Sequence, residues 1–324
     1  MKAKRDVLCF AAIVAAVALT PAVSTHPFLL QIVIQALIWA LLAASWDLLS
    51  GYTGQTSFGH AGFFAIGAYA AALSSLQLGA PLAAGIVIAA LVTAAIGFLV
   101  GFPALRLRGH YLALVTLGFG QIVELGARNL DSVTGGTFGL HDFGGFASLA
   151  RDPASQQLIS FVIVLAVSAS AVAVMLAVTR FTDAGPSFRA IKEDEVLAQS
   201  LGINTTYYKL LAFALSAGMA GLAGALQAYH VRLVAPHISS VGISAMAIGM
   251  TVFGGIGTIW GAFLGGLLLS LIIEGLRFVG VVFNLVAVGL VMTVFVIYFP
   301  TGLAGLRWRG RKRIQRADLG KARD

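Results

Sequence analysis

Long apolar runs restrict the fold of this 324-residue chain more than any other feature of its sequence. Hydrophobic side chains make up 59% of the residues and charged side chains 10%, and the longest uncharged runs exceed the roughly 18 residues that a membrane span requires. Inside lipid the backbone must satisfy its own hydrogen bonds, and a helix does so. The sequence therefore predicts an all-α fold, a polytopic membrane helix bundle. About ten spans are expected, over residues 7–24, 28–49, 59–78, 82–101, 111–126, 158–179, 207–228, 243–257, 259–274 and 283–299.

The distribution of basic residues predicts which side of the membrane each loop faces. If the amino terminus is cytoplasmic, the segments on that side hold all of the 21 lysine and arginine residues except Arg128, Arg151, Arg232 and Arg277. This asymmetry is the positive-inside pattern, and it predicts that both the N- and C-termini are cytoplasmic. Since the basic residues flank apolar runs, nucleic acid is not an expected partner.

Two neighbouring runs, 243–257 and 259–274, leave the span count open. Each run is short, and the stretch 253-FGGIGTIWG-261 between them contains no polar loop. The alternative to ten spans is eight spans plus a re-entrant hairpin. Both counts are even, so both keep the carboxyl terminus on the cytoplasmic side.

Polar segments divide the chain into a membrane domain and a tail. Residues 1–306 are expected to form one transmembrane domain, with an external loop at 127–157 and a cytoplasmic loop at 180–206. Residues 307–324 are rich in lysine and arginine and are expected to form a disordered cytoplasmic tail, which fixes orientation or binds anionic membrane lipid. The histidines lack metal-ligand spacing and Cys9 is the only cysteine, so no metal site is expected.

The cytoplasmic loop 180–206 has the pattern of a short amphipathic helix. Pro186 and Ser187 can start this helix, with Ser187 as N-cap, and Gly202 can end it. Apolar residues recur between them at helical spacing, at Ile191, Leu197, Ala198 and Leu201. The opposite face bears Lys192, Glu193, Asp194, Glu195 and Gln199. The loop is interpreted either as a connecting helix on the membrane surface or as an element that couples to another protein.

The same loop resembles the EAA loop of ABC importer permeases, in which two short helices dock on a cytoplasmic ATPase. An acidic residue, Ala198 and Gly202 follow in the expected order, although Glu195 lies one residue early and Val196 and Leu197 replace the consensus Glu and second Ala. A wider resemblance, to permeases of branched-chain amino acid ABC transporters, covers most of residues 35–305. Four segments carry it: 47-DLLSGYTGQTSFGHAGFFAIGAY-69, 189-RAIKEDEVLAQSLGIN-204, 209-KLLAFALSAGMAGLAGAL-226 and 253-FGGIGTIWGAFLGG-266.

This resemblance implies the permease subunit of an importer that moves branched-chain or related amino acids by alternating access. It implies two cytoplasmic ABC ATPase subunits, a second homologous permease subunit, and a periplasmic or lipid-anchored substrate-binding protein, at the bacterial inner membrane. The residues implied in ATPase coupling are Arg189, Lys192, Glu193, Asp194, Glu195, Ala198 and Gly202. No G-x-x-x-x-G-K-[ST] phosphate loop occurs in the sequence. The chain is therefore expected to bind no cofactor, to hydrolyse no ATP itself and to be no enzyme.

The stretch 51-GYTGQTSFGHAGFFAIGAY-69 combines glycines and polar side chains inside an apolar region. Glycine is tolerated in membrane helices where helices pack closely or where backbone lines a cavity, and both interpretations remain open. Under the second, the translocation path is lined by Gln55, Thr56, Ser57 and His60. Helix breaks are expected at Gly51, Gly54 and Gly59 and, in the similar stretch 253-FGGIG-257, at Gly254, Gly255 and Gly257.

Two rival functions lack the residues that they need. An ion-gradient-driven secondary transporter usually needs ionisable residues or a carbonyl and carboxylate site inside the membrane. The span interiors are nearly free of charge, and Glu124, Glu274 and Arg277 lie at span ends. A membrane-embedded enzyme needs a catalytic cluster, and the sequence contains no recognisable one. The importer permease is the predicted function, with the secondary transporter as its alternative.

Overall fold

A computed structural model describes residues 2–23, 26–105, 107, 109–149, 152–276, 289–290, 292–295, 297–299 and 301–305. Helices dominate these ranges. The described residues form no strand, and their one isolated antiparallel bridge joins Leu140 to Val234. The predicted all-α fold is confirmed. The predicted tail, 307–324, and eight of the 17 residues of the predicted span 283–299 lie outside the described residues.

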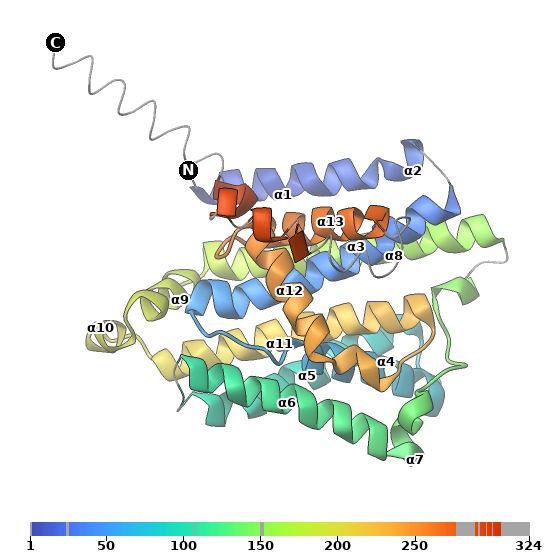
Figure 1. The fold of residues 1–324 in the computed structure, drawn as a ribbon, viewed down its shortest axis with the longest axis horizontal. Coiled ribbons are helices and arrows are strands. Elements are labelled where there is room, and N and C mark those ends of the chain that lie inside the picture. Colours follow the sequence, from blue (N-terminus) through green and yellow to red (C-terminus); the bar gives the residue numbers. More distant parts are fainter. Residues whose placement is uncertain are drawn as a thin grey trace, which may run out of the picture.

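Eight long helices make up most of the bundle, and Figure 1 shows them lying side by side along its long axis. They are α1 (Lys2–Ala18), α3 (Pro27–Trp46), α4 (His60–Leu78), α5 (Leu82–Ala104), α6 (His110–Asn129), α8 (Pro153–Phe181), α11 (Thr205–Val231) and α13 (Ile259–Leu276). Short helices join them: α2 (Thr20–Val23), α7 (Asp131–Thr134), α9 (Ala184–Glu193), α10 (Glu195–Ser200) and α12 (Val241–Gly254). A π-helix, η1 (Asp47–Gly51), continues α3, and three 3₁₀ turns are η2 (Gly136–Phe138), η3 (Phe146–Leu149) and η4 (Pro236–Ser239).

Seven helical segments of the described residues are long and apolar enough to cross a membrane, which confirms a multi-pass membrane protein. They are Arg5–Ala22, Pro27–Gly51, His60–Leu78, Leu82–Ala104, Ser155–Phe181, Thr205–Val231 and Ile259–Leu276. The predicted span 111–126 lies in α6, which has 20 residues but is not among the seven. The predicted span 243–257 lies in α12, whose 14 residues give a length of about 21 Å at 1.5 Å per residue. That length falls short of the roughly 30 Å hydrocarbon core.

Glycine brings α11 into close contact with α4 and α5. A Cβ atom on Gly67 would lie 2.3 Å from the Cα of Gly221, and one on Gly224 would lie 1.9 Å from the carbonyl oxygen of Phe64. On the α5 side, a Cβ on Gly97 would lie 2.3 Å from the Cβ of Ala217. Small residues allow helix backbones to approach this closely in lipid, where packing replaces the hydrophobic effect as the attraction between helices. This contact joins helices from the two halves of the sequence.

The two ends of the bundle carry different connecting segments (Figure 1). The amino terminus, the turn before α6, η1, α9 and α10 lie at one end, whereas α2, α7 and the start of α8 lie at the other. An ion pair between Asp6 and Arg180, both largely buried, ties α1 to the last turn of α8. The segments 127–157 and 180–206 therefore lie at opposite ends of the molecule.

The predicted single helix over 187–202 is wrong, because the structure has two short helices there. The first helix, α9, begins at Ala184 and not at Ser187, whose hydroxyl donates to the carbonyl oxygen of Asp183 at 2.7 Å. The chain then turns at Asp194, which adopts an extended conformation, and its carboxylate accepts from the backbone N–H groups of Val196 and Leu197. A side-chain cap thus starts α10.

The predicted end of that segment is confirmed in its local geometry. Gly202 has a φ of +84°, a left-handed conformation that glycine adopts without a steric penalty. Asn204 then caps α11, because its side-chain oxygen accepts from the backbone N–H of Tyr207 at 3.0 Å. The loop accordingly turns a sharp corner into the next membrane helix.

Candidate coupling site at two helix breaks

Two glycine-rich segments interrupt the helices at the end of the bundle that carries α9. After η1 and two further helical residues, Tyr52 and Thr53, residues 54–59 have no regular structure, and Gly54 has a φ of +74°. Figure 1 shows this segment leaving the end of α3 and returning into the bundle, where α4 begins. The second break separates α12 from α13, with a φ of +117° at Gly255 and +80° at Gly257.

Asp47 joins the two breaks. It is fully buried at the start of η1, and its Oδ1 atom accepts a hydrogen bond from the backbone N–H of Gly257 at 2.6 Å. Gly51 leaves room for this carboxylate, since a Cβ atom there would lie 1.9 Å from the Oδ1 of Asp47. The other carboxylate oxygen has no hydrogen-bond partner among the described residues. A buried carboxylate of this kind is stabilised by a nearby cation or a hydrogen-bond donor.

α9 supplies that cation and contacts the same break. The Nζ atom of Lys192 donates to the carbonyl oxygen of Gly51 at 2.8 Å, and its charge acts on Asp47. One turn earlier, the guanidinium of Arg189 lies 5.5 Å from the ring centroid of Tyr52, a cation–π distance. Burial raises the pKa of the Tyr52 phenol above its ordinary value, so this ring stays neutral. The structure therefore brings α9, the first break and the second break into one contact.

α10 is held to α11 by polar contacts. Glu195 forms an ion pair with Lys209, and the Nε2 of Gln199 donates to the hydroxyl of Thr205 at 2.8 Å. Ala198 is buried at 1% exposure. Together with the corner at Gly202, these contacts fix α10 to the start of a long membrane helix.

The outward face of α10 is apolar, contrary to the sequence prediction. Leu197 and Leu201 were expected on the same apolar face as Ile191 and Ala198, but Ile191 and Ala198 are buried whereas Leu197 and Leu201 are 58% and 72% exposed. Val196 beside them is 59% exposed. Of the acidic residues predicted in coupling, Glu193 and Asp194 are exposed, whereas Glu195 is partly buried.

The polar residues predicted to line a path do not share one environment. Ser57 and His60 are fully buried, Gln55 is 9% exposed and Thr56 is exposed. His60 has both ring nitrogens in hydrogen bonds. Its Nε2 lies 2.8 Å from the hydroxyl of Ser216, which itself donates to the carbonyl oxygen of Ser45, so Nε2 is the donor.

Ser57 contributes to the same buried network. Its hydroxyl lies 3.3 Å from the Nδ1 of His60 and accepts from the backbone N–H of Gly59. The indole of Trp46 donates to the Ser57 carbonyl oxygen at 2.7 Å. Ser57 and His60 thus hold the irregular segment against α3 and α11 in this conformation, and their role in a path stays a prediction.

Comparison with known proteins shows which family the chain belongs to. The model of a family described as branched-chain amino acid transport system / permease component matches residues 28–299. The chain belongs to this permease family. It is accordingly a transport component and not a catalytic enzyme.

Individual relatives carry matching descriptions. The high-affinity branched-chain amino acid transport system permease protein LivM of Salmonella typhimurium is 32% identical over 295 residues, which cover 84% of this chain and 69% of the relative. LivM of Escherichia coli K12 is also 32% identical, over 82% of this chain and 68% of the relative. LivH of the same strain is 27% identical, over 82% of this chain and 91% of the relative. No solved structure matches the chain.

The permease also contains a polar cavity that the sequence analysis missed. It has a volume of about 530 Å³ and lies between α3, α11, α12 and α13. Three glutamines line it, Gln31 and Gln35 on α3 and Gln227 on α11. A signal was present in the sequence, since each of these amides interrupts an otherwise apolar span. This signal does not by itself predict a cavity, because nothing in the local pattern indicates that residues 35 and 227 face each other.

Proposed function

We propose that this chain is the permease subunit of an ATP-binding-cassette importer that carries branched-chain or related amino acids across the bacterial inner membrane. Family membership supports the importer, and the printed names of LivM and LivH support the substrate class. The observation that carries the mechanism is the contact of Lys192 on α9 with the first helix break, which Asp47 joins to the second. Alternating access needs a movable element in contact with both halves of the bundle.

The proposed topology has ten crossings and both termini in the cytoplasm. The end of the bundle that carries α9 also carries the amino terminus and the turn before α6, so one orientation accounts for the basic residues of all three. α12 is too short to cross alone, and we assign the crossing to α12 with the preceding residues 232–240. The tenth crossing is the predicted span 283–299.

The exposed face of α10 is proposed as the docking surface for a cytoplasmic ATPase. Val196, Leu197 and Leu201 offer apolar side chains outside the seven candidate spans, where solvent exposure is unfavourable without a partner. Glu193 and Asp194 add charge at its edge. The ion pair and the hydrogen bond of α10 fix it to α11. Movement of the docked α10 would therefore also move α9, which directly precedes it, and Lys192 of α9 would pass this movement to the breaks.

The proposed assembly follows from the family. It contains two ATPase subunits, which hydrolyse ATP, while this chain binds no cofactor of its own. A second, homologous permease subunit completes the membrane part, and a periplasmic or lipid-anchored binding protein delivers the amino acid. A paralogue is the proposed second permease, because both LivM and LivH of one Escherichia coli strain resemble this chain over 82% of its length.

Leucine uptake by the complete complex in proteoliposomes tests this proposal. Uptake is expected to require ATP and the binding protein, to stop with vanadate, and to continue when an uncoupler removes the proton gradient. The alternative, an ion-gradient-driven secondary transporter, predicts the opposite response to both reagents. Uptake by the purified chain without any ATPase subunit would contradict the importer.

A further inference from the structure

The cavity between α3, α11, α12 and α13 lies toward the end of the bundle opposite α9 and α10. Gln31, Gln35 and Trp39 line it from the first half of α3, which starts at that end. They are spaced by four residues, so consecutive members lie on the same side of the helix. The same spacing continues through Ala43 to Asp47 at the first break. α3 itself therefore links the cavity to the coupling site, although each four-residue step turns by about 40° and carries Asp47 round to the other side of the helix from Gln31.

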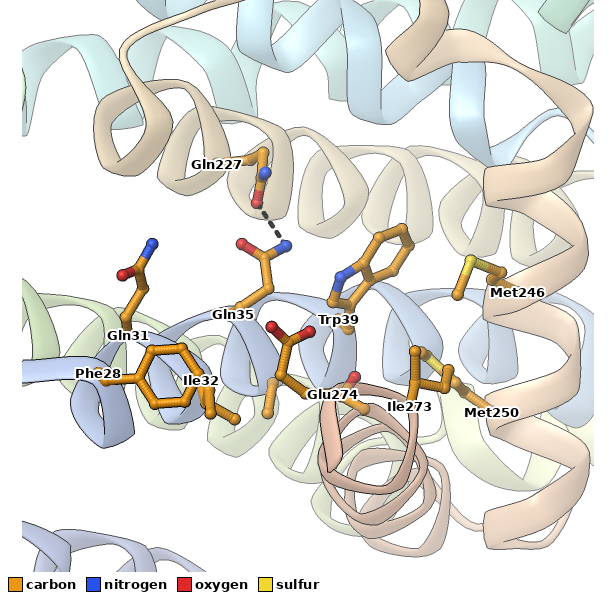
Figure 2. A pocket seen from close by; sticks show the side chains of 12 residues that line it. Phe28, Gln31, Ile32, Gln35, Trp39, Gln227, Met246, Met250, Ile273 and Glu274 are labelled. Carbon is orange, nitrogen blue, oxygen red and sulfur yellow. Dashed lines mark hydrogen bonds between the residues drawn. The ribbon is translucent and has the colours of Figure 1, made fainter. Parts of the chain in front are cut away.

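Polar groups from three helices converge in this cavity. Figure 2 shows Gln35, Gln227 and Glu274 pointing into the same space, and the Nε2 of Gln35 donates to the Oε1 of Gln227 at 3.0 Å. Ser270 also lines it. Its side chain is 8% exposed, and its hydroxyl has no hydrogen-bond partner among the described residues. A buried hydroxyl in this state can bind a ligand without first breaking an internal hydrogen bond.

Apolar side chains form the rest of the lining. Phe28 and Ile32 lie at one side of Figure 2, and Trp39, Met246 and Met250 lie toward the other side. Methionine is flexible and packs against apolar groups of different shapes. The cavity therefore offers an amide and carboxylate region beside an adaptable apolar region, which suits a ligand with one polar and one apolar end.

Tight packing closes the cavity on the side of the helix breaks. A Cβ atom on Gly266 of α13 would lie 2.5 Å from the Cα of Ala40, and the hydroxyl of Thr251 on α12 donates to the carbonyl oxygen of Ala43 at 2.9 Å. Ala43 is fully buried together with Met250, Phe253 and Leu269. The closed layer lies between the cavity and Asp47, and its residue Ala43 is about one turn of the helix before Asp47. Movement of the breaks would act on this layer directly.

We infer that this cavity is the outer half of the passage and binds a zwitterionic, apolar amino acid on its way through the membrane. The carboxylate of Glu274 accepts from the ammonium group of the ligand, and the amides of Gln35 and Gln227 donate to its carboxylate. Trp39, Met246 and Met250 contact the apolar side chain. Only one charge of the ligand then meets an opposite full charge, because neutral amides hold its carboxylate less tightly than a salt bridge would, and weaker binding favours release. This inference rests on the proposed importer function and names where its substrate binds.

The test is leucine uptake per ATP hydrolysed by the complete complex in proteoliposomes, with the double variant Gln35→Leu, Gln227→Leu. Replacing both partners of one hydrogen bond by apolar groups of similar size is nearly neutral for stability, so the complex is expected to assemble. Uptake per ATP is expected to fall about tenfold through the lost contacts to a charged ligand, while ATP hydrolysis stimulated by the binding protein continues. Gln121→Leu on α6, outside the cavity, is the matched control and is expected to behave as the wild type.

A second variant decides the matter if the double variant fails to assemble. Gln31 is exposed at the cavity, so Gln31→Cys in a Cys9→Ser background is expected to tolerate a bulky, membrane-impermeant thiol reagent. Labelling from the outer side is expected to block uptake and to leave stimulated ATP hydrolysis within twofold. Complete labelling with unchanged uptake would overturn the inference, as would unchanged uptake per ATP in the double variant. A wild-type complex without any ATP-dependent uptake would instead overturn the importer proposal.

Discussion

At the scale of single residues, Asp47 holds the second break through one hydrogen bond. We predict that Asp47→Ala destabilises the purified complex by about 1–3 kcal/mol, because the partly buried N–H of Gly257 loses its acceptor. Asp47→Asn keeps a side-chain oxygen as acceptor and is expected to retain most of the stability. Thermal unfolding measures the melting temperatures of the two variant complexes. Equal melting temperatures would show that this hydrogen bond does not contribute to stability.

Lys192 makes the corresponding contact with the first break. Lys192→Met keeps a long apolar stem but cannot donate to the carbonyl oxygen of Gly51. Uptake per ATP hydrolysed is predicted to fall about tenfold, since a hydrogen bond from a charged group contributes about 1.5–3 kcal/mol. The measurement is leucine uptake and ATP hydrolysis in the same proteoliposomes. Arg128→Met, at the opposite end of the bundle, is the control, and a similar loss there would remove the case for coupling through α9.

These residue contacts show what the sequence could not predict. The breaks at Gly54, Gly255 and Gly257 were recognisable because glycine inside an apolar run is conspicuous, whereas the break expected at Gly51 is wrong, since this residue ends the π-helix η1. The contact of Asp47 with Gly257 was not, because 210 residues separate them and no local pattern records which loops meet. The buried position of His60 was left open for the same reason, since its partner Ser216 lies in a distant helix.

At the scale of elements, the exposed apolar face of α10 carries the next prediction. Leu197→Asp with Leu201→Asp is expected to abolish co-purification of the ATPase subunit, because two charges would enter an apolar contact. The permease itself is expected to stay folded, since both side chains are already exposed in the isolated chain. Co-purification from detergent extracts measures the effect.

The control for that experiment is Leu130→Asp. Leu130 is 54% exposed and lies next to α7, at the end of the bundle opposite α10. This variant is expected to retain the ATPase. If the α10 variant also retained it, α10 would be a connecting helix on the membrane surface, the interpretation that the sequence left open.

Apolar runs predicted most of the long helices, whereas helical periodicity, applied to the loop 180–206, misjudged α10. Run length works for a helix such as α11, which is buried on several sides, with Phe213, Ala217 and Leu226 among its buried residues. Periodicity fails for α10, because the apolar side chains of a short helix can contact another protein instead of the core of their own chain. Periodicity also missed the turn at Asp194, since a side-chain cap interrupts the helix without any change in hydropathy.

At the scale of the whole molecule, long apolar runs were sufficient to predict a multi-pass helical protein, but they could not predict the cavity. Its lining residues Gln35, Gln227, Met250 and Ser270 come from four helices, and only their packing places them together. The packing itself depends on glycine contacts between α4 and α11, which join the two halves of the sequence. A bundle that changes shape at two breaks needs such a rigid contact elsewhere.

Gly67 tests that rigid contact. Gly67→Ala would place a Cβ atom 2.3 Å from the Cα of Gly221, and backbone cannot yield as a flexible side chain does, so overpacking is expected to cost about 1–3 kcal/mol. Gly118→Ala on α6 is the matched control, because no atom lies within 4 Å of its added Cβ. Thermal unfolding of the purified complex is expected to show a lower midpoint for Gly67→Ala alone. Equal midpoints for the two variants would mean that α4 and α11 can separate at little cost, and the breaks would then not be the only places where the bundle bends.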